Sequence, residues 1–246
     1  MQKRDYLERV IRRFIAPPIL FECEAEEGGW FAEIHRVAVV FVNIDIRGLP
    51  SLEVMQSAFR VLQRAMISHQ GVIKEFSVDD KGTVMVGALG LPPISGSNPA
   101  GRACTVALKI MEGLEARCCS NSSALGVVCY IGISMGPVFT ATIGGTRREF
   151  AMVGDVVNTA ARLMSAGKKL LNSREKSRIE SLIAYVSDNG GAALLEKGAV
   201  PKQLHRGITV TDAVTASQAC TAVDMISLGE VAVKGKSFPI EIYSPV

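Results

Sequence analysis

The stretch Phe150–Leu163, FAMVGDVVNTAARL, is the most informative part of this chain. Asp155 follows a glycine and is expected to be the N-cap of a helix whose first residues are Val156 and Val157. Asn158 and Arg162 are four positions apart, so their side chains share one face of that helix. Alanines on the far side allow close packing against a sheet. A paired amide and guanidinium suit phosphoryl transfer, in which negative charge spreads over phosphate oxygens.

The composition favours one large domain with an ample apolar core. The chain has 246 residues, of which 48% are hydrophobic, and a formal net charge of only +3. So small a charge gives little support to binding of nucleic acid through a broad basic surface. The six cysteines show no CxxC pair and no zinc-type spacing, which indicates reduced, mostly buried thiols.

Nothing in the sequence predicts secretion or a membrane span. The N-terminal segment MQKRDYLERVIRRF carries charges throughout its helical pattern and has no apolar signal core. The longest apolar run, 124–133, is much shorter than the roughly 20 residues that a span needs. A soluble, cytoplasmic protein without a transmembrane segment is expected.

The hydrophobic periodicity predicts a short N-terminal region followed by one α+β domain. Residues 3–15 form a helix that Pro17 and Pro18 stop, and an acidic linker continues to Gly29, so the domains are 1–29 and 30–246. The second unit has the expected order strand, helix, strand, strand, helix, strand, which is the ferredoxin-like βαββαβ sandwich. The corresponding ranges are 37–44, 54–66, 71–78, 83–89, 101–117 and 125–135.

An insertion is expected at about 168–207. This stretch carries eight Lys or Arg against four acids, with a helix predicted at 174–185. The strand ITVTDAV, at 208–214, returns the chain to the sheet. The insertion is interpreted either as a regulatory or partner-binding segment or as a surface excursion without function.

The opening string resembles the signature of the class III nucleotide cyclases, a Gly-Asp-x-Val-Asn-x-Ala-x-Arg run preceded by Arg148, Glu149 and Phe150. The resemblance extends over most of the chain outside 168–207. It is closest to the bicarbonate-responsive, soluble adenylyl cyclase group, and FVN at 41–43 and DDKG at 79–82 are similar to the second of that group's tandem domains. It implies the cyclase sandwich with extra C-terminal strands. The similar stretches are 12–20, 30–44, 78–93, 132–150 and 228–246.

The resemblance also implies roles for three residues. Asn158 would orient the ribose, and Arg162 would meet the charge that develops on the α-phosphoryl group. Lys234 would hold the terminal phosphates, a role that suits a flexible point charge.

The positions of the metal ligands depart from the pattern of an active cyclase domain. Two Mg²⁺ or Mn²⁺ ions normally assist cyclisation, held by an aspartate in the first strand and another after the hairpin glycine. Asn43 and Thr83 occupy these positions, and neutral oxygens alone make a poor magnesium site. Asp45 has the same parity as Asn43 and is an alternative ligand in a shifted register, although Thr83 still leaves the second carboxylate missing.

The positions that read the base are also irregular. The resemblance places Glu75 and Ala151 there, with Lys74 one residue away. Glu75 can accept hydrogen bonds from guanine, whereas Ala151 has no polar side chain. The base preference therefore stays open between ATP, which the resemblance favours, and GTP.

The leading hypothesis is half of a soluble-type nucleotide cyclase that converts ATP to cyclic AMP and pyrophosphate. A second cyclase domain, packed head to tail in cis or in trans, would supply the metal carboxylates. The alternatives are a guanylyl cyclase half and a non-catalytic, cyclase-like regulatory domain. An RNA-binding domain is disfavoured because the strand Thr83–Leu89 lacks base-stacking aromatic residues.

Overall fold

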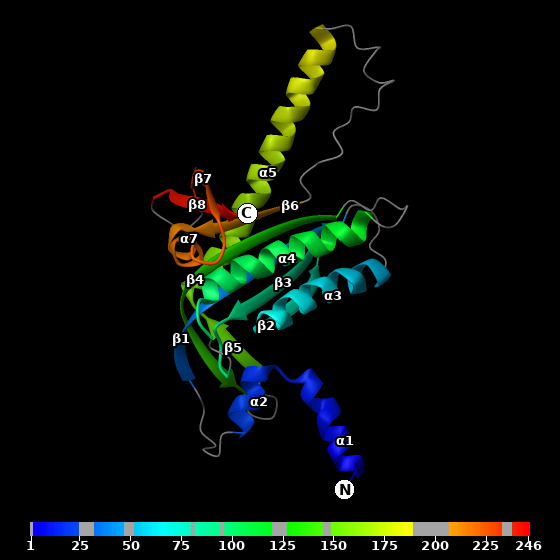
Figure 1. The fold of residues 1–246 in the computed structure, drawn as a ribbon, viewed down its shortest axis with the longest axis vertical. Helices are drawn as coiled ribbons and strands as arrows, with labels where there is room; N and C mark the ends of the chain where they lie inside the picture. Colours follow the sequence, from blue (N-terminus) through cyan, green and yellow to red (C-terminus); the bar gives the residue numbers. More distant parts are fainter. Residues whose placement is uncertain are drawn as a thin grey trace.

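The computed structural model describes residues 2–24, 32–46, 52–79, 82–93, 96–119, 127–144, 149–188, 207–232 and 238–246. In these ranges eight strands form one sheet in the order β2-β3-β1-β4-β6-β8-β7, and β5 pairs with β4 (Figure 1). The strands are β1 (Ala32–Ile46), β2 (Gly71–Asp79), β3 (Gly82–Leu89), β4 (Val127–Ile143), β5 (Glu149–Val153), β6 (Gly207–Asp212), β7 (Met225–Val231) and β8 (Ile240–Pro245). The helices are α1 (Gln2–Ile11), the 3-10 turn η1 (Arg12–Phe14), α2 (Pro17–Glu24), α3 (Leu52–Ser68), α4 (Pro99–Cys119), α5 (Asp155–Asp188) and α7 (Ala213–Ala219).

The predicted ferredoxin-like arrangement is confirmed. Strand β1 lies antiparallel between β3 and β4, and α3 and α4 make the two helical connections of the βαββαβ unit. Strands β6, β8 and β7 extend the sheet beyond β4, as the extra C-terminal strands were expected to do. The valine-rich β1 is the predicted central strand, because residues of both parities between Val37 and Val40 are buried.

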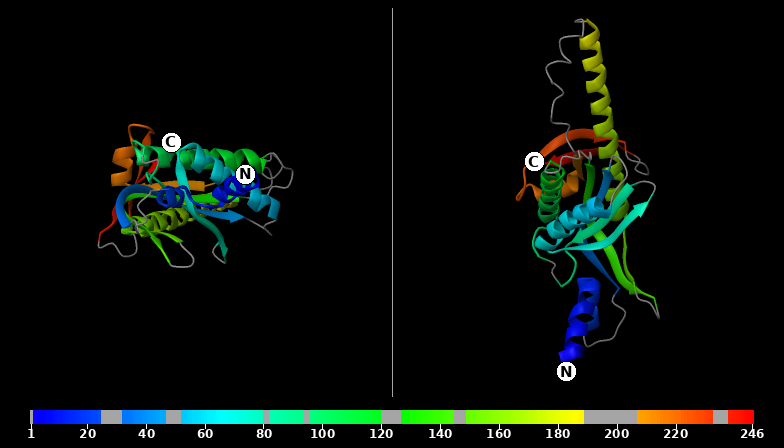
Figure 2. Two further views of the ribbon diagram at one scale, coloured as in Figure 1. Left: turned by 90° about the horizontal axis from the view of Figure 1, so that it is seen from below. Right: turned by 90° about the vertical axis from the view of Figure 1, so that its right-hand side faces the viewer.

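Helices cover both faces of the sheet (Figure 2). On one face, α3 and α4 pack their apolar sides on the even-numbered residues of β1, with Leu62 and Ile110 fully buried. On the other face, Val156 and Ala160 of α5 pack against Val37 and Val39. The two faces of β1 are therefore separate layers, and a residue's parity decides which helices it meets.

The first turns of α5 lie unusually close to β4. A Cβ atom added at Gly132 would be 2.0 Å from the carbonyl oxygen of Ala160 and 2.4 Å from the amide nitrogen of Met164. Glycine at 132 is what permits this approach, and the buried Ala160 confirms the expected packing of the small face on the sheet. This contact fixes how the helix presents its opposite face.

The N-terminal prediction is wrong in one respect. The helix expected over 3–15 ends at Ile11 and passes through η1, and Pro17 then begins α2 where the prediction had the start of a linker. Proline is accepted at the first position of a helix because the amide hydrogen there has no partner within the helix. The rest of the expected linker, 25–31, lies outside the described residues.

The region after Met164 also differs from expectation. The sequence predicted an insertion from about 168 with its own helix at 174–185, but α5 continues without a break from the signature to Asp188. Residues 165–188 contain no proline, and nothing in that stretch stops a helix. The proposed insertion at 168–207 thus begins as a helical extension, and 189–206 lie outside the described ranges.

The returning strand is shorter than predicted. Strand β6 pairs parallel with β4 but ends at Asp212, where 208–214 had been expected to stay extended. The Asp212 carboxylate caps α7, since Oδ1 accepts hydrogen bonds from the Thr215 amide at 2.8 Å and from its hydroxyl at 2.7 Å. A helix cap at the end of the strand is the signal that periodicity alone overlooks.

Three free cysteines have described side chains: Cys104 and Cys129 are buried, and Cys220 is exposed. Burial, with a smaller contribution from the Asp212 charge, raises the pKa of Cys104 to about 12, and burial also raises the pKa of Cys129. Both buried thiols therefore stay protonated at neutral pH. No helix in the described part of the chain is long and apolar enough to cross a membrane.

Candidate functional site

Asn158 and Arg162, the two residues that first suggested phosphoryl transfer, lie in the first turns of α5. The helix begins at Asp155, so this residue opens the helix and Gly154, not Asp155, holds the cap position. The Gly154 carbonyl accepts a hydrogen bond from the Val157 amide at 3.2 Å, and Asp155 Oδ2 accepts one from the Thr159 hydroxyl at 3.4 Å. The predicted cap is thus displaced by one residue, while the helical phase after it is unchanged.

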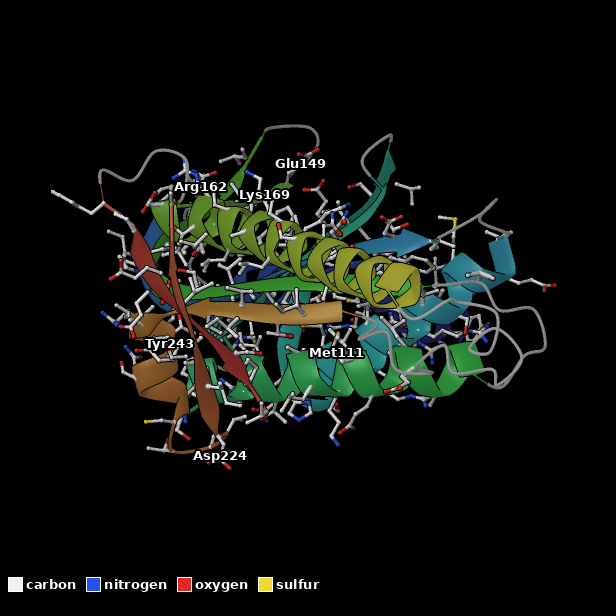
Figure 3. The ribbon with its side chains drawn as sticks, turned by 90° about the horizontal axis from the view of Figure 1, so that it is seen from above. Met111, Glu149, Arg162, Lys169, Asp224 and Tyr243 are labelled. Atoms are coloured by element: carbon white, nitrogen blue, oxygen red, sulfur yellow. The ribbon has the colours of Figure 1, made fainter. Side chains whose placement is uncertain are left out.

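Asn158 and Arg162 lie on the face of α5 opposite the buried Ala160. Asn158 is exposed and Arg162 is partly buried. Lys169, two turns beyond Arg162, lies on the same side of the helix (Figure 3). Within the described ranges, neither Asn158 nor Arg162 makes a side-chain hydrogen bond or ion pair. An amide and a guanidinium are therefore available together at one surface.

The end of β1 holds a different group. Asn43 and Asp45 share the parity of Val37 and Val39, so they lie on the face that α5 covers. Lys168 of α5 reaches both: its Nζ is 3.4 Å from Asn43 Oδ1 and 3.7 Å from Asp45 Oδ2. The same ammonium lies 5.0 Å from the centre of the Tyr130 ring. A cationic side chain is thus bound where the sequence had suggested ligands for a metal ion.

Thr83 does not join this group. The register of β1 and β3 places Thr83 opposite Ile44, whose side chain belongs to the face covered by α3 and α4. Among the described residues no three His, Cys, Asp or Glu side chains cluster in a way that suits a metal ion. One exposed carboxylate, one amide and a lysine ammonium do not fit a divalent cation, which prefers several oxygen ligands and negative charge.

The second strand explains why the position that reads the base was ambiguous. The pairing of β2 with β3 shifts between Ile73 and Glu75, so Lys74 is the extra residue of a β-bulge. Lys74 and Glu75 are both exposed there. Ala151 lies on β5, where it pairs with Ala141 of β4, and β5 does not pair with β2. The structure therefore does not bring Glu75 and Ala151 together through a shared ladder.

Lys234 lies outside the described residues, between β7 and β8. Its predicted role as a phosphate ligand stays a prediction.

Lys168 is the residue that the sequence reasoning missed. It lies one turn after Met164 and one turn before Leu171, which both pack with Tyr130. The sequence did contain a signal for this residue, because a lysine between two inward-facing apolar positions of a helix is expected to point toward the sheet. It was overlooked because residue 168 was assigned to the insertion expected at about 168–207 and not to the helix of the signature.

Comparison with known proteins agrees with the fold and the signature. The family model described as the adenylate and guanylate cyclase catalytic domain matches residues 32–172. Adenylate cyclase type 10 of Oryctolagus cuniculus is 28% identical over 167 residues, which are 64% of this chain and 10% of that protein. Soluble guanylate cyclase 89Db of Drosophila melanogaster is 28% identical over 141 residues, 55% of this chain and 20% of that protein.

Solved structures resemble the whole fold. The adenylyl cyclase CyaB from P. aeruginosa has a TM-score of 0.63 at 19% identity, covering 88% of this chain and 96% of that one. A bacterial light-regulated adenylyl cyclase has a TM-score of 0.69 at 14% identity, covering 99% of this chain and 62% of that one. The chain spans about a tenth of the length of the type 10 cyclases it matches. Because the family model matches more than half of its residues, this chain belongs to the adenylate and guanylate cyclase catalytic domain family.

Proposed function

We propose that this chain is one half of a soluble-type adenylyl cyclase. It supplies Asn158, Arg162 and Lys234 to a site shared with a second cyclase domain, and that partner supplies the metal carboxylates. Cyclase domains of this family bind nucleoside triphosphates, act as dimers and generally depend on divalent metal ions. The observation that carries the proposal is the contrast between an available Asn158–Arg162 pair and a strand end at β1 that does not fit a metal.

In the proposed reaction the ribose 3′-oxygen of ATP forms a bond to the α-phosphorus. The bond from that phosphorus to the bridging oxygen of pyrophosphate breaks, and the hydroxyl proton passes to solvent. Arg162 stabilises the charge that builds on the α-phosphoryl oxygens, and Asn158 orients the ribose. Lys234 holds the terminal phosphates as a point charge. Mg²⁺ or Mn²⁺ would be held by the partner's carboxylates, so no residue of this chain is assigned to it.

An exposed apolar row supports pairing with a second domain. Ile34, Phe139 and Val153 are direct cross-strand neighbours on β1, β4 and β5, and their exposed fractions are 72%, 43% and 62%. Adjacent apolar side chains on one sheet face are typical of a protein interface. We assign this row, which we call the arm row, to contact with the partner domain.

ATP is the proposed substrate because of the likeness to adenylate cyclase type 10. The exposed Glu75 and the similar identity to a Drosophila soluble guanylate cyclase favour GTP as the second candidate. A non-catalytic regulatory domain is a third candidate, favoured by Asn43 and Thr83 at the metal positions and by Ala151 at a position that reads the base.

The test is complementation. The purified chain is mixed with a cyclase domain that carries both metal aspartates, and cyclic AMP and cyclic GMP are quantified by mass spectrometry with ATP or GTP and Mg²⁺. Arg162→Ala should lower product formation by about 100-fold or more, because charge stabilisation in the transition state is lost. Arg60→Ala, an exposed arginine on α3, is the matched control and should leave activity unchanged. Equal activity of the Arg162 variant and the wild type would refute the assigned role.

A further inference from the structure

We propose that Lys168 is a built-in cation that occupies the place of a divalent metal ion at the end of β1. This inference rests on the proposed function in one point only, namely that a partner domain holds the metal of the productive site. It adds a reason why the β1 end of this chain does not bind metal, beyond the loss of an aspartate.

The first argument is the position of the ammonium. Lys168 Nζ donates a hydrogen bond to Asn43 Oδ1 at 3.4 Å and lies 3.7 Å from Asp45 Oδ2. These are the two oxygen-bearing side chains of β1 that face α5 at this end of the strand. A divalent ion between the same oxygens would have to share its space with the ammonium, at a distance where like charges repel strongly.

The second argument is charge. A magnesium site in a protein normally uses one or two carboxylates, and a manganese site has similar oxygen ligands. With asparagine at 43, Asp45 is the carboxylate that the described part of β1 retains at this place, and a single ammonium balances its charge. Lysine also lies over the Tyr130 ring at 5.0 Å from its centre, a contact that stabilises a cation. Together, these surroundings suit the singly charged ammonium of Lys168 better than they suit a divalent metal ion.

The third argument is how the ammonium is positioned. Tyr130 is 4% exposed and packs with Leu171, Met164 and Ile208. Lys168 lies between Met164 and Leu171 on this inward side of α5, so its backbone is held by packing on either side. The side chain is 35% exposed, which leaves its end near solvent while the stem is covered.

A consequence follows for a pair of domains. Two domains packed head to tail form two related sites, one with the partner's metal residues and one with the β1 end of this chain. With Lys168 in place, the second of these sites holds no divalent ion. Each pair therefore has one productive site.

The experiment measures Mn²⁺ binding by the purified chain alone, without nucleotide or partner, using the loss of the free Mn²⁺ signal in electron paramagnetic resonance. The wild type, Asn43→Asp, Lys168→Met and Asn43→Asp/Lys168→Met are compared, with Lys169→Met as a control of equal charge on the exposed side of α5. We expect the double variant to bind one Mn²⁺ per chain at least tenfold more tightly than Asn43→Asp alone. The wild type and Lys169→Met should bind none at this place.

Two results would overturn the proposal. One is equal Mn²⁺ binding, or equal lack of it, by Asn43→Asp with and without Lys168. The other is one Mn²⁺ bound per wild-type chain and lost on Asp45→Asn.

Thermal unfolding is a second readout that does not depend on the double variant folding. Lys168→Met alone should lower the Tm by roughly 2 to 4 °C relative to Lys169→Met, since the ammonium contacts with Asn43, Asp45 and the Tyr130 ring are lost. Identical melting of the two variants would count against a bound ammonium. Neither readout uses cyclase activity, so failure of the complementation test and failure of this proposal are distinguishable.

Discussion

At the scale of single residues, the geometry of the site depends on a glycine that carries no chemistry. Gly132 lets α5 approach β4 so closely that a methyl group would overlap the Ala160 carbonyl oxygen. Backbone atoms of a packed helix cannot move aside as the end of a side chain can. The orientation of Asn158 and Arg162 therefore follows from the absence of a side chain on the neighbouring strand.

Gly132→Ala should destabilise the fold by about 3 kcal/mol, the upper part of the usual range for overpacking in a core. Urea unfolding followed by circular dichroism measures the change in the free energy of unfolding. Gly113→Ala is the comparison variant, because its added methyl would lie 2.7 Å from Cγ1 of the Val61 side chain instead of against backbone atoms, and alanine is the better helix former. It should therefore cost clearly less than Gly132→Ala. Similar stability of the Gly132 variant and the wild type would contradict the close approach.

Asp212 is the second residue on which local structure depends. Its carboxylate accepts hydrogen bonds from the Thr215 amide, the Thr215 hydroxyl and the Ser134 hydroxyl, the last at 2.6 Å. We expect Asp212→Ala to cost about 2 kcal/mol, since a helix cap is lost and partly buried donors lose their acceptor.

Thermal unfolding checks this expectation against Ser217→Ala, an exposed serine in the same helix whose hydroxyl donates to the nearby Val214 carbonyl. The Asp212 variant should melt well below the Ser217 variant. Indistinguishable melting temperatures would mean that the cap does not hold α7 in place.

At the scale of elements, hydrophobic periodicity correctly predicted the strands and helices that are positioned by burying an apolar face. Strand β1, the hairpin of β2 and β3, and helices α3 and α4 all show apolar spacing that matches the faces they bury. Their order was enough to predict the ferredoxin-like core. Elements whose limits depend on local rules were predicted less well.

The misplaced limits have physical causes. Pro17 opens a helix because its missing amide hydrogen is not needed there. Strand β6 ends where the Asp212 side chain replaces the ladder by a helix cap. Helix α5 runs on because no residue stops it, and this length is what brings Lys168 to Asn43. Lys168 and Asn43 are 125 positions apart in the sequence, and no local sequence pattern predicts a contact over that separation.

The arm row gives a prediction for β4. Phe139→Ser removes the central side chain of the row and should weaken association with a metal-bearing cyclase domain by roughly tenfold, which corresponds to about 1.4 kcal/mol. Analytical ultracentrifugation of mixtures measures this change. The variant itself should stay folded, because Phe139 is 43% exposed.

Ile67→Ser, which replaces another exposed apolar residue at the end of α3, is the control and should associate normally. If both variants paired as tightly as the wild type, the arm row would not be part of the interface.

At the scale of the whole molecule, the proposed function gives one set of reaction groups to this chain and the other set to a partner domain. Asn158 and Arg162 were predicted from sequence because their spacing and the surrounding signature are local. Under the proposed function the metal carboxylates come from another domain, so their positions could not be predicted from this chain. We propose that the contacts of Lys168 with Asn43 and Asp45 at the end of β1 account for this asymmetry.

The asymmetry is tested by resolving activity by molecular size. The chain, a metal-bearing cyclase domain whose own Asn and Arg positions have been replaced, and their mixture are each passed through a sizing column. Every fraction is then assayed with ATP and Mg²⁺ for cyclic AMP. We expect no product from either protein alone, and product only in fractions of the mixed pair. Turnover by this chain alone, at a rate similar to that of the pair, would contradict its assignment as half of an active site.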